Sequence, residues 1–308
     1  MSLQHPWGAP RRRGRTARAG LAVVTSAIVM LLTGCSAESR GEWERLAMPE
    51  PGTVEGTSTL ALWQGAWIAA LVTGAIVWGL IGFAVVRYRR RSDDEIPVQT
   101  RYNLPLEIFY TIAPVMMVVV FFVNTVRVQN IVLDDSTPDN IVEVTGQQWS
   151  WTFNHGVGAI DTAADDDNTD MEFPFDQYAY EVGTASYIPT LWLPVDETTR
   201  FNLHSPDVIH DFGVPGFLIK MDVIPGRVNA YQVTPTEEGE YLGKCYELCG
   251  VYHSRMLFKV KVVSREEYDD YVAGLVEAGN ASDLPLIGGD DARTQAGLDT
   301  DETEGEGE

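Results

Sequence analysis

Residues 60–91 read LALWQGAWIAALVTGAIVWGLIGFAVVRYRRR, an apolar run that ends abruptly in a cluster of arginines. No charged residue occurs between 56 and 86. A helix of about 20 such residues crosses a hydrocarbon core of about 30 Å. Lys and Arg next to a membrane helix are enriched on the cytoplasmic side. The sequence therefore predicts a membrane-spanning helix whose basic end lies inside the cell.

A second uncharged stretch, residues 108–126, lies between Glu107 and Arg127. It contains Pro114, which a membrane helix tolerates because neighbouring groups satisfy the freed carbonyl. This stretch brings the chain back to the outer side. We therefore expect a two-helix transmembrane hairpin over residues 60–127 with both ends outside the cytoplasm.

The chain begins with a basic segment and a short apolar segment of residues 19–34, which is the pattern of a secretory signal. The apolar segment ends Leu32-Thr33-Gly34-Cys35, which resembles the lipobox of bacterial lipoproteins. The resemblance implies that residues 1–34 are a signal peptide, that Cys35 becomes lipidated, and that residues 35–59 form an external segment. The alternative is an ordinary signal peptide or an uncleaved anchor with a chance cysteine.

The charge of the 308-residue chain is −22, and it is unevenly distributed. Residues 1–127 carry 13 basic and 9 acidic side chains, whereas residues 128–308 carry 9 basic and 35 acidic ones. This balance argues against nucleic-acid binding and favours a cationic partner. The acidic run Asp165–Asp167 either steers such a partner or only solubilises the surface. Three cysteines are too few for a disulfide framework.

Beyond residue 140 the sequence changes to short segments rich in Val, Tyr, Trp, Phe and Thr, separated by Pro, Gly and Asp. Such segments predict an all-β sandwich or barrel. We expect a long loop over 154–181, a short helix that begins after Ser264 with Glu267 completing a capping box, and an acidic disordered tail from residue 280. The candidate strands are 141–145, 148–153, 187–193, 199–204, 228–234, 240–245 and 256–263.

The segment Cys245–Met256 carries chemistry, because it places thiol, thiol, imidazole and thioether groups at relative positions 0, 4, 8 and 11. Thiolate and thioether ligands favour copper, and a methionine argues against zinc. A mononuclear blue-copper loop uses one cysteine. The two cysteines, Cys245 and Cys249, therefore indicate two metal ions bridged by sulfur.

The chain resembles subunit II of haem-copper, aa3-type cytochrome c oxidases. The resemblance rests on Trp149-Ser150-Trp151, Asp207-Val208-Ile209-His210, Val214-Pro215, Ile224-Pro225-Gly226-Arg227 and the Cys245–Met256 loop, in that order. It implies a mixed membrane and all-β architecture, in which the hairpin precedes a cupredoxin-like β-sandwich or barrel over residues 128–263. It also implies that this domain holds the dinuclear copper centre called CuA, and that a short helix and tail fill residues 264–308.

The same resemblance implies a role for each matching residue. Cys245 and Cys249 bridge the two coppers, and His210 and His253 each bind one of them. The weak ligands are Met256 and the backbone carbonyl of Glu247, whose side chain reaches a magnesium or manganese ion shared with subunit I.

Further positions match the family outside the copper loop. Trp149 matches the exposed tryptophan that receives electrons from cytochrome c; the alternative is a tryptophan of the strand core. Glu107 matches the carboxylate at the mouth of a proton channel; the alternative is a simple helix boundary. His204 matches no ligand and is expected at a strand end, and His155 is expected on the surface or in a loop.

The implied function is electron transfer from cytochrome c through CuA to haem in subunit I, where oxygen is reduced to water and protons are translocated. The expected partners are subunit I, the other oxidase subunits, cytochrome c and membrane lipid, at the outer side of a bacterial plasma membrane. No Cys-x-x-Cys-His motif occurs, so the donor is a separate protein or domain. Two alternatives are a nitrous-oxide-reductase-like CuA domain and a copper-free subunit of a quinol oxidase.

Overall fold

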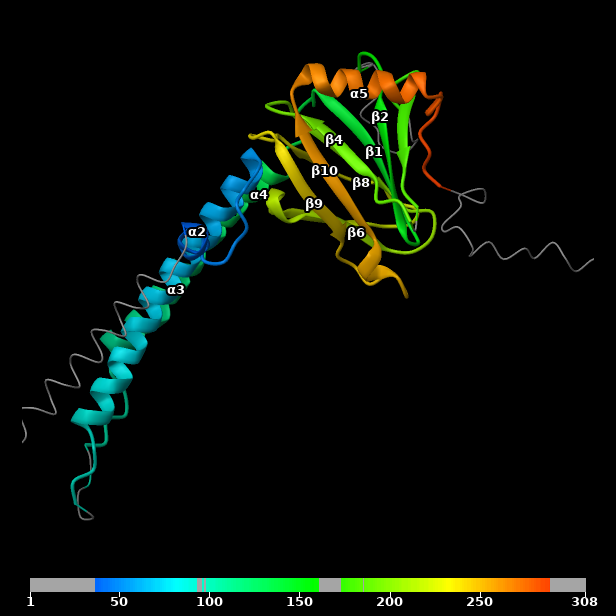
Figure 1. Cartoon of the computed structure of the whole chain (residues 1–308). Helices are drawn as coiled ribbons and strands as arrows, with labels where there is room; N and C mark the ends of the chain where they lie inside the picture. The colour runs from blue at the N-terminus through cyan, green and yellow to red at the C-terminus, as the bar shows by residue number, and fades with distance from the viewer. Residues whose placement is uncertain (1–36, 93–95, 97, 161–172, 185, 289–308) are drawn as a thin grey trace, which may run out of the picture. The chain divides into compact units, whose positions relative to one another are not determined.

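The computed structural model describes residues 37–92, 96, 98–160, 173–184 and 186–288 (Figure 1). The chain divides into two compact units, residues 1–48 and 49–308. The described part of the first unit contains the helix α2 (Ala37–Glu44). The expected signal peptide, Cys35, the run Asp165–Asp167 and residues 289–308 lie outside the described residues.

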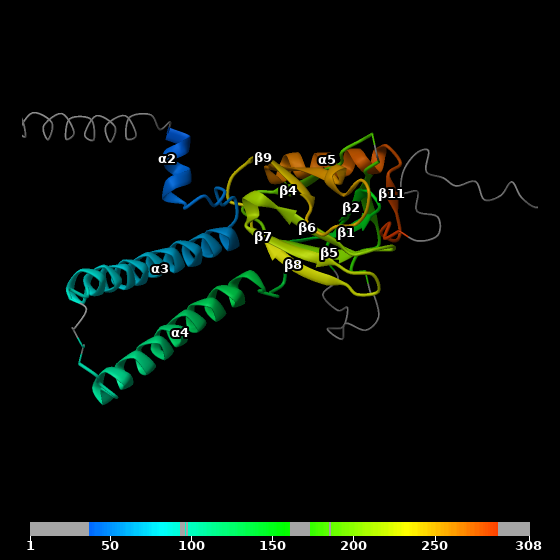
Figure 2. The ribbon, with the colours of Figure 1, turned by 90° about the horizontal axis from the view of Figure 1, so that it is seen from below.

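Two long helices open the second unit, α3 (Val54–Arg87) and α4 (Leu104–Val132), and they run alongside each other in Figures 1 and 2. The side chain of Thr53 caps α3 by accepting the Gly56 N–H at 3.0 Å. Asn103 caps α4 in the same way. Both helices are long and apolar enough to cross a membrane, and none of their apolar windows is buried within the chain. This agrees with the two spans that hydropathy predicts.

The first turn of α3 is hydrogen-bonded to the β domain. The backbone N–H of Val54 donates to the carbonyl of Thr234 at 3.1 Å, and the N–H of Thr234 donates to Glu55 Oε2 at 3.0 Å. Glu55 is only 8% exposed. The Glu55 carboxylate therefore connects Thr234 of the β domain to the first turn of α3.

The β domain is a sandwich of two sheets, as the spacing of short β segments predicts. The strands β1 and β5 pair in parallel, as do β4 and β10, and the other pairings within the two sheets are antiparallel. The first sheet has the order β11 (Ala281–Ser282), β3 (Tyr178–Val182), β2 (Ser150–Gly156), β1 (Asn140–Gln147), β5 (Thr199–His204) and β8 (Asn229–Val233). The second has the order β4 (Thr190–Pro194), β10 (Leu257–Val263), β9 (Gly239–Cys245), β6 (His210–Val214) and β7 (Ile219–Val223).

Aromatic side chains fill the space between the sheets. The rings of Phe212 and Phe258 stack with centroids 4.7 Å apart, and Phe153, Phe201 and Trp151 meet them edge to face. All five side chains are fully buried. Aromatic rings dominate core energetics because each removes a large apolar area from water. This core carries the strand ends on which the metal-ligand candidates sit.

Helix α5 (Arg265–Glu277) follows the last long strand and packs against the outside of the sandwich, next to β3 and β4 (Figure 1). Ser264 accepts the Glu267 N–H at 3.3 Å, as the predicted capping sequence requires. Tyr268 and Val272 face inward and pack with Ala179 and Val263. The amphipathic face of α5 therefore closes a second small core.

The expectation that His155 lies on the surface or in a loop is wrong. His155 belongs to β2, its side chain is fully buried, and its Nδ1 lies 3.1 Å from the hydroxyl of Tyr268. Burial without a charged partner lowers the pKa of His155 to about 3. The histidine is buried because β2 continues to Gly156, where α5 covers it.

Two segments expected to be irregular, the 154–181 loop and the tail from residue 280, each contribute a strand to the first sheet. Residues 178–182 form β3 at the end of the predicted 154–181 loop, and residues 281–282 form β11 beside it. Beyond β11, the backbone of Leu286 accepts from Thr145 Oγ1 at 2.8 Å and donates to Asn154 Oδ1 at 2.8 Å. The described start of the acidic tail is therefore bound to the sandwich, contrary to its composition.

Candidate metal centre

The candidate ligands are brought together by pairing between β6 and β9. His210 begins β6, Cys245 ends β9, and the register places Phe212 opposite Cys245. The loop that follows is closed at its base, because the N–H of Cys245 donates to the carbonyl of Met256 at 3.0 Å. A histidine 35 residues upstream is thus placed against a loop of 12 residues.

Sulfur and nitrogen atoms converge at this point. The two Sγ atoms of Cys245 and Cys249 lie 3.8 Å apart. His210 Nδ1 lies 3.9 Å from Cys245 Sγ, and His253 Nδ1 lies 3.6 Å from Cys249 Sγ. Met256 Sδ is 3.8 Å from Cys249 Sγ. The candidates therefore form one continuous group in which each cysteine is adjacent to one histidine.

The group is buried and its cysteines are not oxidised to each other. Cys245 and Cys249 are each 4% exposed, His210 and Met256 are fully buried, and His253 is half-buried. A sulfur–sulfur distance of 3.8 Å is far from the roughly 2.05 Å of a disulfide. Both described cysteines are free thiols that face each other.

The electrostatics of the two thiols favour a bound cation. Burial opposes ionisation of Cys245, but the hydrogen bonds with His210 and with the backbone of Asp211 and Glu247, together with the charge of His210, outweigh burial and lower the pKa of this thiol. Burial and then the neighbouring charge of Cys245 raise the pKa of Cys249 to about 12. Two thiolates at this distance require positive charge between them, which metal ions supply. The donor set of two thiols, two imidazoles and a thioether fits copper.

Asp207 holds the imidazole of His210 from behind. Its Oδ1 lies 2.9 Å from His210 Nε2, which leaves Nδ1 directed at the sulfur of Cys245. Hydrogen bonds from His210 and from the N–H groups of Gln148 and Val208 outweigh burial and lower the pKa of Asp207. A carboxylate in this position fixes the ring orientation and tautomer of a metal-binding histidine. No role is expected for Asp207 from the sequence, although an acidic residue three positions before the histidine is a usable signal.

Trp149 lies against the loop, at the turn between β1 and β2. Its indole Nε1 donates to the carbonyl of Cys249 at 3.2 Å, and its ring meets Tyr252 edge to face at 5.1 Å. The neighbouring Gln148 donates to the same carbonyl at 2.6 Å. Trp149 is half-buried, whereas Trp151, two residues later, is the fully buried core tryptophan.

Of the remaining residues considered in the sequence, Glu247 lies beside the metal-ligand group, whereas Glu107 and His204 belong to other elements of the structure. The carbonyl of Glu247 is 3.2 Å from Cys245 Sγ, while the residue itself is exposed. Glu107 accepts the N–H of Asn103 at 2.9 Å in the first turn of α4, far along the chain from the metal-ligand group. His204 ends β5 as expected, and its Nε2 is 2.6 Å from Glu143 Oε2.

Comparison with known proteins identifies the relatives of this chain. Residues 140–263 match the family described as cytochrome c oxidase subunit II, periplasmic domain. A probable cytochrome c oxidase subunit 2 of Streptomyces avermitilis is 45% identical, over 90% of this chain and 92% of that protein. Cytochrome c oxidase subunit 2 of Mycobacterium bovis is 34% identical, over 91% and 87%. The periplasmic domain of subunit II from Bradyrhizobium japonicum aligns with 46% of this chain and 96% of its own, at 24% identity and a TM-score of 0.39.

Proposed function

Because the chain belongs to the cytochrome c oxidase subunit II family, we propose that its buried sulfur–imidazole group is a dinuclear CuA centre that receives electrons from cytochrome c. The chain is a subunit of a haem-copper terminal oxidase, and its sequence contains no Cys-x-x-Cys-His motif. The single observation that carries the proposal is the 3.8 Å approach of two unoxidised thiols, each next to an imidazole.

Each ligand candidate has a defined task in this proposal. Cys245 and Cys249 would bridge the two metals, His210 and His253 would bind one metal each, and Met256 and the carbonyl of Glu247 would be weak ligands. Copper bound there would gain and lose single electrons. The rigid β6–β9 base and the aromatic core keep the ligands in place, so that little reorganisation accompanies a change of charge.

Trp149 is the proposed point of electron uptake. Its indole is a half-buried ring that lies against the loop, and its Nε1 is hydrogen-bonded to the backbone of a proposed bridging cysteine. This contact gives a short path from the surface to Cys249. The net charge of −22 favours a cationic cytochrome, because opposite charge accelerates association in a salt-dependent way.

Electron paramagnetic resonance of the copper-loaded full chain tests the proposal. A mixed-valent pair gives hyperfine splitting from two equivalent copper nuclei and two coppers per chain. Cys245→Ser and Cys249→Ser should each abolish that signal, while Cys35→Ser, which changes the third cysteine, should retain it. A four-line spectrum from a single copper, or an unchanged signal after either loop substitution, would contradict the bridging role.

The membrane arrangement is also part of the proposal. The basic cluster after α3 and the family match to a periplasmic domain support a hairpin whose ends and β domain face the outside of a bacterial plasma membrane. We place a lipidated Cys35 at the mature N-terminus. Incorporation of labelled fatty acid into the native chain but not into Cys35→Ser checks the lipoprotein; equal incorporation would refute it.

Two carboxylates have proposed roles toward the haem subunit. The exposed side chain of Glu247 would contribute to a magnesium or manganese site shared with subunit I, and Glu107 would lie at the mouth of a proton channel. Loss of bound Mn²⁺ in the assembled oxidase on Glu247→Gln checks the first role. Slower turnover on Glu107→Gln with the copper signal unaltered checks the second; unchanged turnover would leave Glu107 as a helix-capping residue only.

A further inference from the structure

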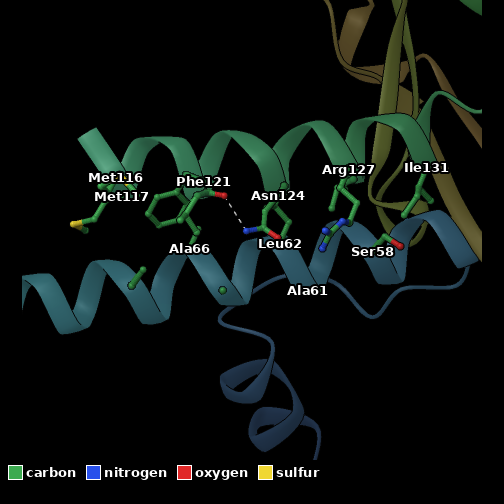
Figure 3. Close-up of a pocket in the computed structure, with 14 residues that line it drawn as sticks. Ser58, Ala61, Leu62, Ala66, Met116, Met117, Phe121, Asn124, Arg127 and Ile131 are labelled. Atoms are coloured by element: carbon green, nitrogen blue, oxygen red, sulfur yellow. Dashed lines mark hydrogen bonds between the residues drawn. The ribbon is translucent and has the colours of Figure 1, made fainter. Parts of the chain in front are cut away.

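The outer halves of α3 and α4 enclose an apolar groove of about 740 Å³ (Figure 3). Apart from Leu62, its α3 wall is made of small side chains such as Ala61, Gly65 and Ala66, while larger side chains such as Met117 and Phe121 line the α4 wall. The volume lies within the range of about 300–1,000 Å³ that is typical of small-molecule sites. The small side chains of α3 leave an open space between the two helices, and the larger side chains of α4 line that space with apolar groups.

One charged residue lines this groove. Arg127 lies in the last turns of α4, is exposed, and points from α4 toward α3 in Figure 3. Within the described residues, no carboxylate lies at salt-bridge distance from its guanidinium. A cation at the edge of a membrane helix is costly unless an anion or water satisfies it. The nearby Asn124 donates through Nδ2 to the carbonyl of Val120 at 2.9 Å, and among the described residues no hydrogen bond joins its amide oxygen to Arg127.

The part of the groove between Met116 and Arg127 matches one leaflet of a bilayer in length. Arg127 lies eleven positions after Met116 on α4, a rise of about 16 Å at 1.5 Å per residue, and the lining continues one turn further to Ile131. Half of a hydrocarbon core of about 30 Å is about 15 Å. Arg127 lies toward the end of the groove that is nearer the β domain, since α4 ends at Val132 and leads into β1.

We propose that this groove binds an anionic phospholipid of the outer leaflet. Its phosphate pairs with the guanidinium of Arg127, and an acyl chain lies between Gly65 and Ala66 on one side and Phe121 on the other. An apolar helix of another subunit fits less well, because it would desolvate Arg127 without offering it a partner. The inference needs the membrane hairpin but not the copper centre.

Native mass spectrometry of the detergent-solubilised full chain, titrated with phosphatidylglycerol, tests this site. Phosphatidylcholine with the same acyl chains is the uncharged comparison. We expect one phosphatidylglycerol per chain, bound more tightly than phosphatidylcholine. Arg127→Gln should weaken phosphatidylglycerol binding at least tenfold and leave phosphatidylcholine binding unchanged. Arg87→Gln, at the opposite end of α3, is the matched control and should bind as the native chain does.

A pair of glycine variants tests the acyl part of the site. A Cβ added at Gly65 or at Gly79 meets no atom within 4 Å, so both positions accept a side chain, but only Gly65 lines the groove. Gly65→Leu should weaken binding of both lipids, and Gly79→Leu should not. Circular dichroism with the helix content of the native chain shows that each variant is folded.

Three results would overturn the proposal. The first is phosphatidylglycerol binding that Arg127→Gln leaves intact. The second is equal binding by Gly65→Leu and Gly79→Leu. The third is found in the assembled oxidase: a cross-link forms from position 117 to a helix of another subunit, and no phospholipid is retained. A protein helix would then occupy the groove.

Discussion

The indole Nε1 of Trp149 donates a hydrogen bond to the backbone carbonyl of Cys249 at 3.2 Å. This contact joins a partly accessible aromatic ring to a proposed bridging cysteine across 100 residues of sequence. The same carbonyl also accepts a hydrogen bond from the side chain of Gln148, so two neighbouring residues hold the loop at Cys249. Electron uptake should therefore depend on Trp149 more strongly than copper binding does.

Trp149→Phe should slow electron transfer from cytochrome c by about tenfold or more, which corresponds to about 1.4 kcal/mol in the barrier. The variant loses the indole donor but keeps an aromatic ring next to Tyr252. Stopped-flow reduction of the copper centre measures the rate. Trp192→Phe, a half-buried tryptophan stacked on Tyr271 elsewhere in the sandwich, is the control and should behave as the native chain. Equal rates in the two variants would remove Trp149 from the path.

Asp207→Asn should weaken copper binding by about 10- to 100-fold, the usual cost of losing a carboxylate that supports a metal-binding histidine. The amide carries no charge to orient the His210 ring. Competition with a copper chelator measures the affinity. The exposed Asp196→Asn serves as the control of equal charge change. If copper affinity is the same in both variants, the contact between Asp207 and His210 does not position the ligand.

His155 should make the stability of the β domain depend on pH. The folded domain keeps His155 neutral down to about pH 3, whereas the unfolded chain protonates it near pH 6.5. Its contribution is therefore complete above pH 6.5 and is lost as the pH falls from 6.5 toward 3. The free energy of unfolding should drop by at most about 1.4 kcal/mol per pH unit from this group.

Chemical unfolding of the full chain at several pH values measures that dependence. His155→Phe should give a shallower slope between pH 6.5 and 4, whatever its stability at neutral pH. A slope identical to that of the native chain would show that His155 is not the neutral buried group that its surroundings indicate.

Substitution by alanine should destabilise the domain at one glycine of β9 and leave its stability nearly unchanged at another. A Cβ at Gly243 would lie 2.0 Å from Cζ of Phe258, a ring fixed in the aromatic core, whereas a Cβ at Gly239 meets nothing within 4 Å. Gly243→Ala should therefore destabilise the domain by about 1–3 kcal/mol. Gly239→Ala should change stability by less than about 0.5 kcal/mol. Thermal unfolding followed by circular dichroism compares the two variants. Equal unfolding midpoints would mean that the ring of Phe258 moves aside without a loss of stability.

Several features follow from the sequence alone because they depend on neighbouring residues. The uncharged runs and the arginines after Val86 specify two membrane helices through local hydropathy, and both helices are present. The spacing from Cys245 to Met256 places three sulfur groups and one imidazole on one short loop, so the preference for copper can be predicted from the sequence without knowledge of the fold. The turn residues between β segments likewise predict a sandwich.

Other features required the tertiary structure because they depend on pairing across the sequence. Strands β6 and β7 are not among the strands expected from the sequence, since both are short and a Pro-Gly turn separates them. Yet β6 is the strand that brings His210 to the loop. The burial of His155 depends on α5, and the docking of Leu286 depends on β1 and β2.

The chemistry of the candidate site was thus determined by which side chains the sequence carries at short range. Its geometry was decided by sheet register, which local patterns do not encode, because hydrogen bonds between distant strands set it. The same holds for Trp149 and Trp151, which are only two residues apart in the sequence. In the structure Trp151 lies in β2 with its side chain in the core, whereas Trp149 lies in the turn before β2 and its indole contacts the metal-ligand loop, because β2 begins only at Ser150.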